Sequence, residues 1–238
     1  MENKQQLPDT GYKSELTTRE RIAVLGYLPI HIWLLPAALY AMLVAGRVTE
    51  SEANMLCYAI GMGYMLMSAF GFLRRDFDPL CDRPLWCLLQ IVASYGIMLA
   101  LNLCVAAVLA LLNSLANPNN AAVMSMAETD SGGIAAMALF MAPIVEELLF
   151  RAGIFGTLRR YSRAAAYAVG VLSFSLYHVW AYAAVDPSYW IYLLQYLPVS
   201  FLMCRLYERT ESIWCSIFFH MLVNAVSLKA LSMLEGML

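Results

Sequence analysis

The segment GIAAMALFMAPIVEELLFRAGIFGTL, residues 133–158, is apolar along its length except for three charged side chains. These are Glu146, Glu147 and Arg151. Lipid tails cannot solvate charge, and a charged side chain at mid-membrane costs about 2.5–3.5 kcal/mol on insertion scales. A segment of this length and composition predicts a transmembrane helix whose charges are paired or functional.

Local pairing accounts for two of the three charges. Glu147 and Arg151 are four residues apart, so on a helix they share a face and can neutralise each other. Glu146 points about 100° away from Glu147. The third charge therefore needs a partner from elsewhere in the chain.

The composition of the whole chain predicts an integral membrane protein. Of its 238 residues, 61% are hydrophobic and only 13% are charged, whereas about a quarter of residues are charged in soluble domains. The net charge of −2 and the scattered basic residues give no indication of nucleic acid as a partner. The composition therefore predicts the lipid bilayer as a partner.

Uncharged runs of helical length predict an all-α, polytopic membrane helical bundle with about seven transmembrane helices. Residues 1–21 form a polar cytosolic tail, and residues 22–132 hold helices 1–3 and an exposed polar loop at 113–132. Residues 133–238 hold helices 4–7, the first of which carries the three charges. The seven predicted spans are 22–46, 53–73, 85–112, 133–158, 164–185, 187–204 and 213–234.

The basic residues predict the orientation of these spans. From the N-terminus, the connecting segments carry 4, 1, 3, 0, 3, 0, 2 and 1 Lys or Arg residues. Cytoplasmic loops hold the excess of Lys and Arg. The alternation therefore predicts a cytosolic N-terminus and a C-terminus on the outer side.

Few polar residues in the later spans can meet Glu146. At about 1.5 Å per residue, His178, His220 and Asn224 lie at roughly the same depth as Glu146, in or near the cytosolic half. We therefore expect one polar cluster in a cavity that opens toward the cytosol. His31, in the first span, is interpreted as a buried structural residue.

This set of side chains suits hydrolysis of an amide. A glutamate and a histidine can bind and deprotonate a water, and a histidine with an asparagine can donate hydrogen bonds to an oxyanion. Intramembrane ionisable residues are functional by default. The cluster therefore predicts a catalytic site.

Three motifs in this region resemble those of the CAAX-protease and bacteriocin-processing (CPBP) intramembrane proteases, also called the Abi or Rce1-like group. They are E-E-x-x-x-R (Glu146, Glu147, Arg151), F-x-x-x-H (Phe174, His178) and H-x-x-x-N (His220, Asn224), in the order typical of the family. The resemblance implies that Glu146 activates the water with help from His178. It further implies that His220 and Asn224 stabilise the oxyanion, while Glu147 and Arg151 orient the site.

The resemblance leaves the catalytic type open, because the family has been described both as metalloproteases and as glutamate-dependent enzymes. Zinc, if present, would be held by Glu146, His178 and His220. There is no H-E-x-x-H helix of the kind found in many zinc proteases. A metal-free glutamic mechanism is slightly favoured, with no certain cofactor.

The predicted function is an intramembrane endopeptidase that cleaves a membrane-anchored protein, a lipidated peptide or a leader peptide. We expect it in the bacterial inner (cell) membrane, as a multi-pass protein. One alternative is a non-catalytic membrane immunity or scaffold protein of the same family, and another is a small transporter, since intramembrane charges also line ion paths.

Overall fold

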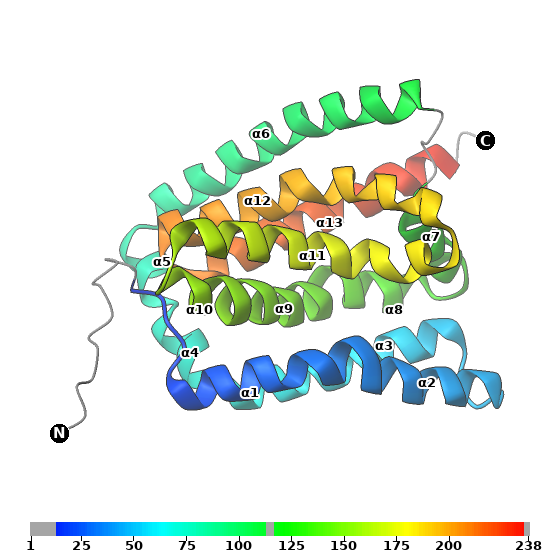
Figure 1. Cartoon of the computed structure of the whole chain (residues 1–238), viewed down its shortest axis with the longest axis horizontal. Helices are drawn as coiled ribbons and strands as arrows, with labels where there is room; N and C mark the ends of the chain where they lie inside the picture. Colours follow the sequence, from blue (N-terminus) through cyan, green and yellow to red (C-terminus); the bar gives the residue numbers. More distant parts are fainter. Residues whose placement is uncertain (1–12, 113–116, 236–238) are drawn as a thin grey trace.

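The computed structural model describes residues 13–112 and 117–235, and within these ranges the chain is helical and contains no strand (Figure 1). The prediction of an all-α polytopic bundle is confirmed. The elements are α1 (Thr18–Pro29), η1 (Ile30–Leu34), α2 (Leu35–Val44), α3 (Glu50–Ser68), α4 (Phe70–Arg75), α5 (Asp78–Asp82), α6 (Pro84–Leu111), α7 (Pro118–Thr129), α8 (Ser131–Ala136), η2 (Met137–Met141), α9 (Ala142–Glu146), η3 (Glu147–Phe155), α10 (Gly156–Arg159), α11 (Arg163–Val185), η4 (Pro187–Tyr192), α12 (Leu193–Thr210) and α13 (Ile213–Glu235).

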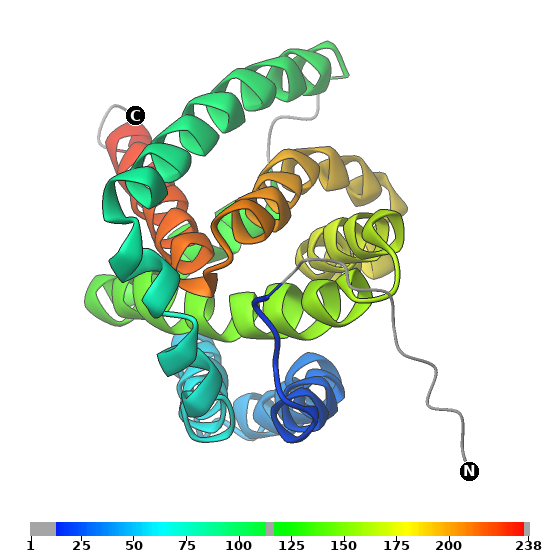
Figure 2. The same ribbon diagram turned by 90° about the vertical axis from the view of Figure 1, so that its left-hand side faces the viewer.

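The helices are stacked in layers. In Figures 1 and 2, α1, α2 and α3 lie on one side, and the nearly continuous helix from α8 to α10 lies above them beside α11. Beyond these come α12 and α13, with α6 packed on their outer side. The segment that carries Glu146 is therefore enclosed between other helices, and 56% of its span is buried.

Within the described residues, five helical segments are long and apolar enough to cross a membrane. They are Thr18–Val44, Pro84–Leu111, Ser131–Arg159, Arg163–Val185 and Ile213–Ala230, and α3 with Phe70–Asp82 makes a sixth that is bent by 72°. Large apolar side chains on these segments are exposed, as expected for helices in contact with lipid. The count of seven and the orientation stay predictions.

The predicted sixth span differs most from the structure. Residues 187–192 form the 3₁₀ helix η4, and the α-helix α12 starts at Leu193 and continues to Thr210. It therefore includes Arg205, Glu208 and Arg209, which is why it is not among the apolar segments. Glu208 accepts hydrogen bonds from Arg159 (2.5 Å) and Arg163 (2.9 Å), which ties α12 to the helices beside it.

The prediction of an exposed loop at 113–132 is wrong for residues 118–129, which form α7. Pro118 occupies the first turn, and the Asn117 side chain accepts a hydrogen bond from the backbone N–H of Asn119 (2.9 Å). Met126 then packs against Ile134 and other apolar side chains. Apolar Ala, Val and Met between the polar residues supply the buried face that a loop does not have.

Two short π-helical turns interrupt the membrane helices, and each is followed by a proline. In η1 the N–H of Leu35 reaches back to Ile30, and in η2 the N–H of Ala142 reaches back to Met137. The next residue in each case is proline, Pro36 or Pro143. Proline has no N–H and its ring clashes with the carbonyl four residues earlier, so the wider turn relieves the clash.

Asp76 fastens the N-terminal segment to the start of α13. Its carboxylate accepts hydrogen bonds from Ser14 Oγ (2.5 Å) and from the backbone N–H of Ile213. Its own carbonyl accepts from Ser212 Oγ (2.7 Å), and Ser14 Oγ also bonds to the hydroxyl of Tyr207 (2.7 Å). These groups are buried, so the end of the bundle that carries the basic loops is closed.

The orientation can be tested by labelling single cysteines. Cys81, in α5 at the end with the basic loops, is exposed. With a membrane-impermeant maleimide added to intact cells, we expect no labelling of Cys81, and labelling only after permeabilisation. Asn120→Cys, made in a Cys81→Ser, Cys104→Ala background, lies at the opposite end and should be labelled without permeabilisation. The reverse pattern would show that the basic loops face outward.

Candidate functional site

Glu147, the first residue of η3, is a fully paired carboxylate. Oε1 lies 2.9 Å from Nδ1 of His220, and Oε2 accepts a hydrogen bond from Ser216 Oγ (2.5 Å) and lies 3.3 Å from Nε of Arg151. All of these side chains are buried. The charge of Glu147 is therefore compensated by one local and two distant partners, and the predicted contact with Arg151 is present.

Arg151 is fully buried and makes further contacts beyond Glu147. Its guanidinium lies 4.0 Å from the centre of the Phe174 ring, a cation–π arrangement. One terminal nitrogen contacts Ser200 Oγ (3.4 Å) and the sulfur of Met203 (2.8 Å) on α12. Arg151 thus holds Glu147 from one side and Phe174 from the other, which fits an orienting role.

The partners of the two histidines determine which ring nitrogen carries the proton. Nδ1 of His178 lies 3.0 Å from the carbonyl oxygen of Phe174, which can only accept, so Nδ1 is the donor. Nδ1 of His220 likewise donates to Glu147. In the neutral form of each ring, the lone pair is therefore on Nε2.

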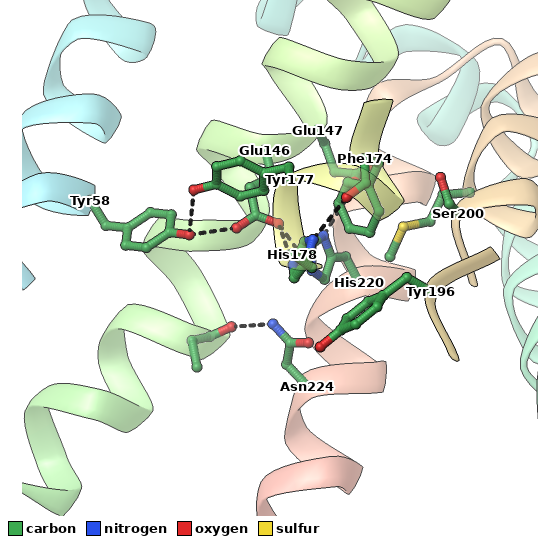
Figure 3. Close-up of polar contacts among 12 residues, drawn as sticks. Tyr58, Glu146, Glu147, Phe174, Tyr177, His178, Tyr196, Ser200, His220 and Asn224 are labelled. Atoms are coloured by element: carbon green, nitrogen blue, oxygen red, sulfur yellow. Dashed lines mark hydrogen bonds and ion pairs between the residues drawn. The ribbon is translucent and has the colours of Figure 1, made fainter. Parts of the chain in front are cut away.

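Both Nε2 atoms face Glu146. Oε2 of Glu146 lies 3.7 Å from Nε2 of His178 and 3.8 Å from Nε2 of His220 (Figure 3). These separations are too long for direct hydrogen bonds. Within residues 13–112 and 117–235, Oε2 is buried without a hydrogen-bond partner. The three atoms surround a position that suits a bridging water.

The other oxygen of Glu146 is held by a residue that the sequence did not single out. Tyr58, on α3, donates a hydrogen bond to Oε1 (2.7 Å), and its hydroxyl lies 3.0 Å from that of Tyr177 on α11 (Figure 3). Tyrosine is common in membrane helices, so neither residue carries a motif that would have identified it. The hydroxyl contacts depend on how α3 packs against α9 and α11.

Asn224 lies in the same cavity but makes a different contact from the one expected. Its amide nitrogen donates a hydrogen bond to the carbonyl oxygen of Ala138 in η2 (2.8 Å). The N–H of Ala142 is bonded to the carbonyl of Met137, so it does not donate to Ala138. Residue 143 is a proline, which has no N–H, so it cannot donate to the carbonyl of Ala138 either. One N–H of Asn224 therefore pins α13 to η2, and only the second remains for a substrate.

Aromatic rings fix the histidine positions. The Phe174 ring lies 4.5 Å from the His178 ring and 5.8 Å from the His220 ring. On its other side, His178 stacks on Tyr196 at 4.7 Å. The phenylalanine of the F-x-x-x-H motif thus separates the Arg151 cation from both imidazoles and packs against each.

The site lies at the inner end of a cavity of about 800 Å³, a volume typical of ligand-binding pockets. The cavity extends toward the end of the bundle where α2 ends and α3 begins, and Leu43, Glu50, Asn120 and Tyr182 line that part. The basic loops lie at the other end. The expected opening toward the end with the basic loops is therefore wrong, because Asp76 and the packed core close that end.

The predicted zinc ligands can be compared with the structure. Among the residues that the structure describes, no group of three or more His, Cys, Asp or Glu side chains has the arrangement needed to hold one. Glu146, His178 and His220, the predicted zinc ligands, face one another at the separations given above. The gap between them is wide enough for a bridging water.

Comparison with known proteins identifies the part of the chain that holds these residues. Residues 130–226 match the family model for type II CAAX prenyl endopeptidase Rce1-like proteins. A Bacillus subtilis (strain 168) protein named "Putative membrane peptidase YdiL" is 33% identical over 84 residues. The match covers 35% of this chain and only 31% of that relative's length. No solved structure matches.

The matched residues include all six predicted site residues, from Glu146 to Asn224. Helices α1 to α6 lie outside the match. The resemblance to the CPBP group is thus confirmed for residues 130–226 of this integral membrane protein, which match the Rce1-like family model and include every motif residue.

Proposed function

We propose that this protein is an intramembrane endopeptidase of the glutamic type, in which Glu146 is the general base. The observation that carries the proposal is the unpartnered Oε2 of Glu146, which faces two imidazole lone pairs across a water-sized gap. Glu147, one residue away, has both oxygens paired. The contrast between the two carboxylates supports a reactive role for Glu146 and an orienting role for Glu147.

The proposed reaction is hydrolysis of a peptide bond. A water held by Oε2 of Glu146 and Nε2 of His178 attacks the carbonyl carbon, and Glu146 takes one of its protons. The carbon–nitrogen bond then breaks as Glu146 returns that proton to the leaving nitrogen. The products are a free amine and a carboxylic acid, which releases its own proton to solvent.

The remaining residues stabilise the charge that develops on the carbonyl oxygen. The second N–H of Asn224 is a candidate donor, and Nε2 of His220 becomes one when that ring is protonated. Glu147 holds the His220 ring in place, because its carboxylate accepts a hydrogen bond from Nδ1. Arg151 acts only through Glu147 and Phe174, so it is a positioning residue.

The cavity lining supports an uncharged peptide segment as substrate. Amide side chains recur along it, and the described lining contains no Lys or Arg. Amides offer both donors and acceptors, which suit the N–H and C=O groups of an extended backbone. We propose a membrane-anchored protein or a lipidated or leader peptide, cleaved in the bacterial inner (cell) membrane.

Glu146→Gln tests the base directly. Glutamine keeps an oxygen to accept from Tyr58, so the variant should fold, but it cannot take a proton from water. We expect kcat to fall by about 10²-fold or more. The measurement is mass spectrometry of a peptide library incubated with purified protein in liposomes.

Glu52→Gln is the matched control for this substitution. Glu52 is exposed and belongs to a capping box that glutamine can also complete. The Glu52→Gln variant should cleave the peptide library at the wild-type rate. If Glu146→Gln cleaves the library at the wild-type rate, Glu146 is not the base.

Removal of metals separates the two catalytic types. Since the proposed mechanism uses no metal ion, we expect the cleavage rate to be unchanged, within about twofold, after dialysis against a chelator. Addition of zinc should not raise it. A loss on dialysis that zinc restores would establish a metalloprotease.

A further inference from the structure

We propose that Tyr58, Tyr177 and His31 form a hydrogen-bonded chain that positions the catalytic carboxylate of Glu146. The inference deepens the proposed function and rests on it. Tyr58 Oη donates to Oε1 of Glu146 (2.7 Å), the two tyrosine hydroxyls are 3.0 Å apart, and Tyr177 Oη lies 3.1 Å from Nε2 of His31. The chain links α3, α11 and η1 to the site.

Counting hydrogens gives the chain a direction. When Glu146 is ionised it can only accept, so the single hydroxyl hydrogen of Tyr58 points to it. Tyr58 must then accept from Tyr177, whose hydrogen is thereby used. Tyr177 can in turn only accept from His31, which places a proton on Nε2 of that ring. Every donor in the chain points toward Glu146.

This chain explains the burial of His31. The ring is 1% exposed, and within the described residues its Nδ1 has no hydrogen-bond partner. It lies in the π-helical turn η1, and such turns are frequent at functional sites because they change the direction of a side chain. Because His31 bonds to Tyr177, we propose a role for it in the site in addition to the structural role expected from the sequence.

The chain also determines which oxygen of Glu146 faces the histidines. Because Tyr58 holds Oε1, the other oxygen is directed at Nε2 of His178 and of His220. Without Tyr58, the carboxylate could rotate and either oxygen could leave the gap. Helices outside the family match thus contribute to the site.

Tyr58→Phe tests the first link. The substitution removes one hydroxyl and leaves the ring, so we expect kcat to fall by about 10-fold or more and KM to change by less than about twofold. Tyr64→Phe is the matched control on the same helix. Its hydroxyl donates to the carbonyl of Ala23 (3.2 Å), away from Glu146, and its loss should leave kcat unchanged.

His31 tests the far end of the chain. His31→Gln retains an N–H that can donate to Tyr177, whereas His31→Leu does not. We expect His31→Leu to lower kcat and His31→Gln to recover most of the loss. Equal activity of these two variants would remove His31 from the chain.

A second measurement does not depend on cleavage. In a double-mutant cycle of thermal unfolding, Tyr58→Phe and Glu146→Leu should be non-additive, because leucine cannot accept from Tyr58, while Tyr64→Phe and Glu146→Leu should be additive. Additive effects in both cycles, or a Tyr58→Phe variant with wild-type kcat, would overturn the proposed chain. A peptide library left uncleaved by the wild type would instead contradict the proposed function, and the double-mutant cycle would still test the hydrogen-bonded chain.

Discussion

Compensation of the buried Glu147 carboxylate is the constraint on which the rest of the site depends. A carboxylate inside the bundle is tolerated only if its oxygens are paired, and here the partners come from Arg151, Ser216 and His220. Two of these three belong to α13. Satisfying one charge therefore fixes the depth of α13 beside η3, and with it the position of His220 opposite Glu146.

The same energetic requirement is left unmet at Glu146. Its Oε2 is buried and lacks a partner in the described part of the chain, which in a purely structural residue would be a cost without compensation. Two imidazoles with fixed tautomers face this oxygen. Because the contacts of Glu147 hold the surrounding side chains in place, Oε2 of Glu146 can bind a water without rearrangement of the site.

The sequence predicted much of this site because spacing on a helix is a local property. The contact of Glu147 with Arg151 follows from four-residue spacing, and charges in an apolar segment require partners. The sequence could not predict Tyr58 or Tyr177, whose contacts depend on packing between distant helices. It also could not predict toward which end of the bundle the cavity extends. The depth of Glu146 along its helix does not show which end of the bundle is filled by packed side chains. The misplaced limits of α12 have a similar cause: the helix continues past the apolar run into Glu208 and Arg209. Glu208 accepts hydrogen bonds from Arg159 and Arg163, and Arg209 lies over the ring of Trp86.

The anchor at Asp76 has a consequence for biosynthesis. It joins Ser14, near the start of the described chain, to Ile213, the first residue of α13. Contacts of such large sequence separation form late, because the intervening chain must first be made and inserted. His220 lies two turns beyond this anchor. The bundle is therefore sealed, and His220 is brought opposite Glu146, only after α13 has been made and inserted.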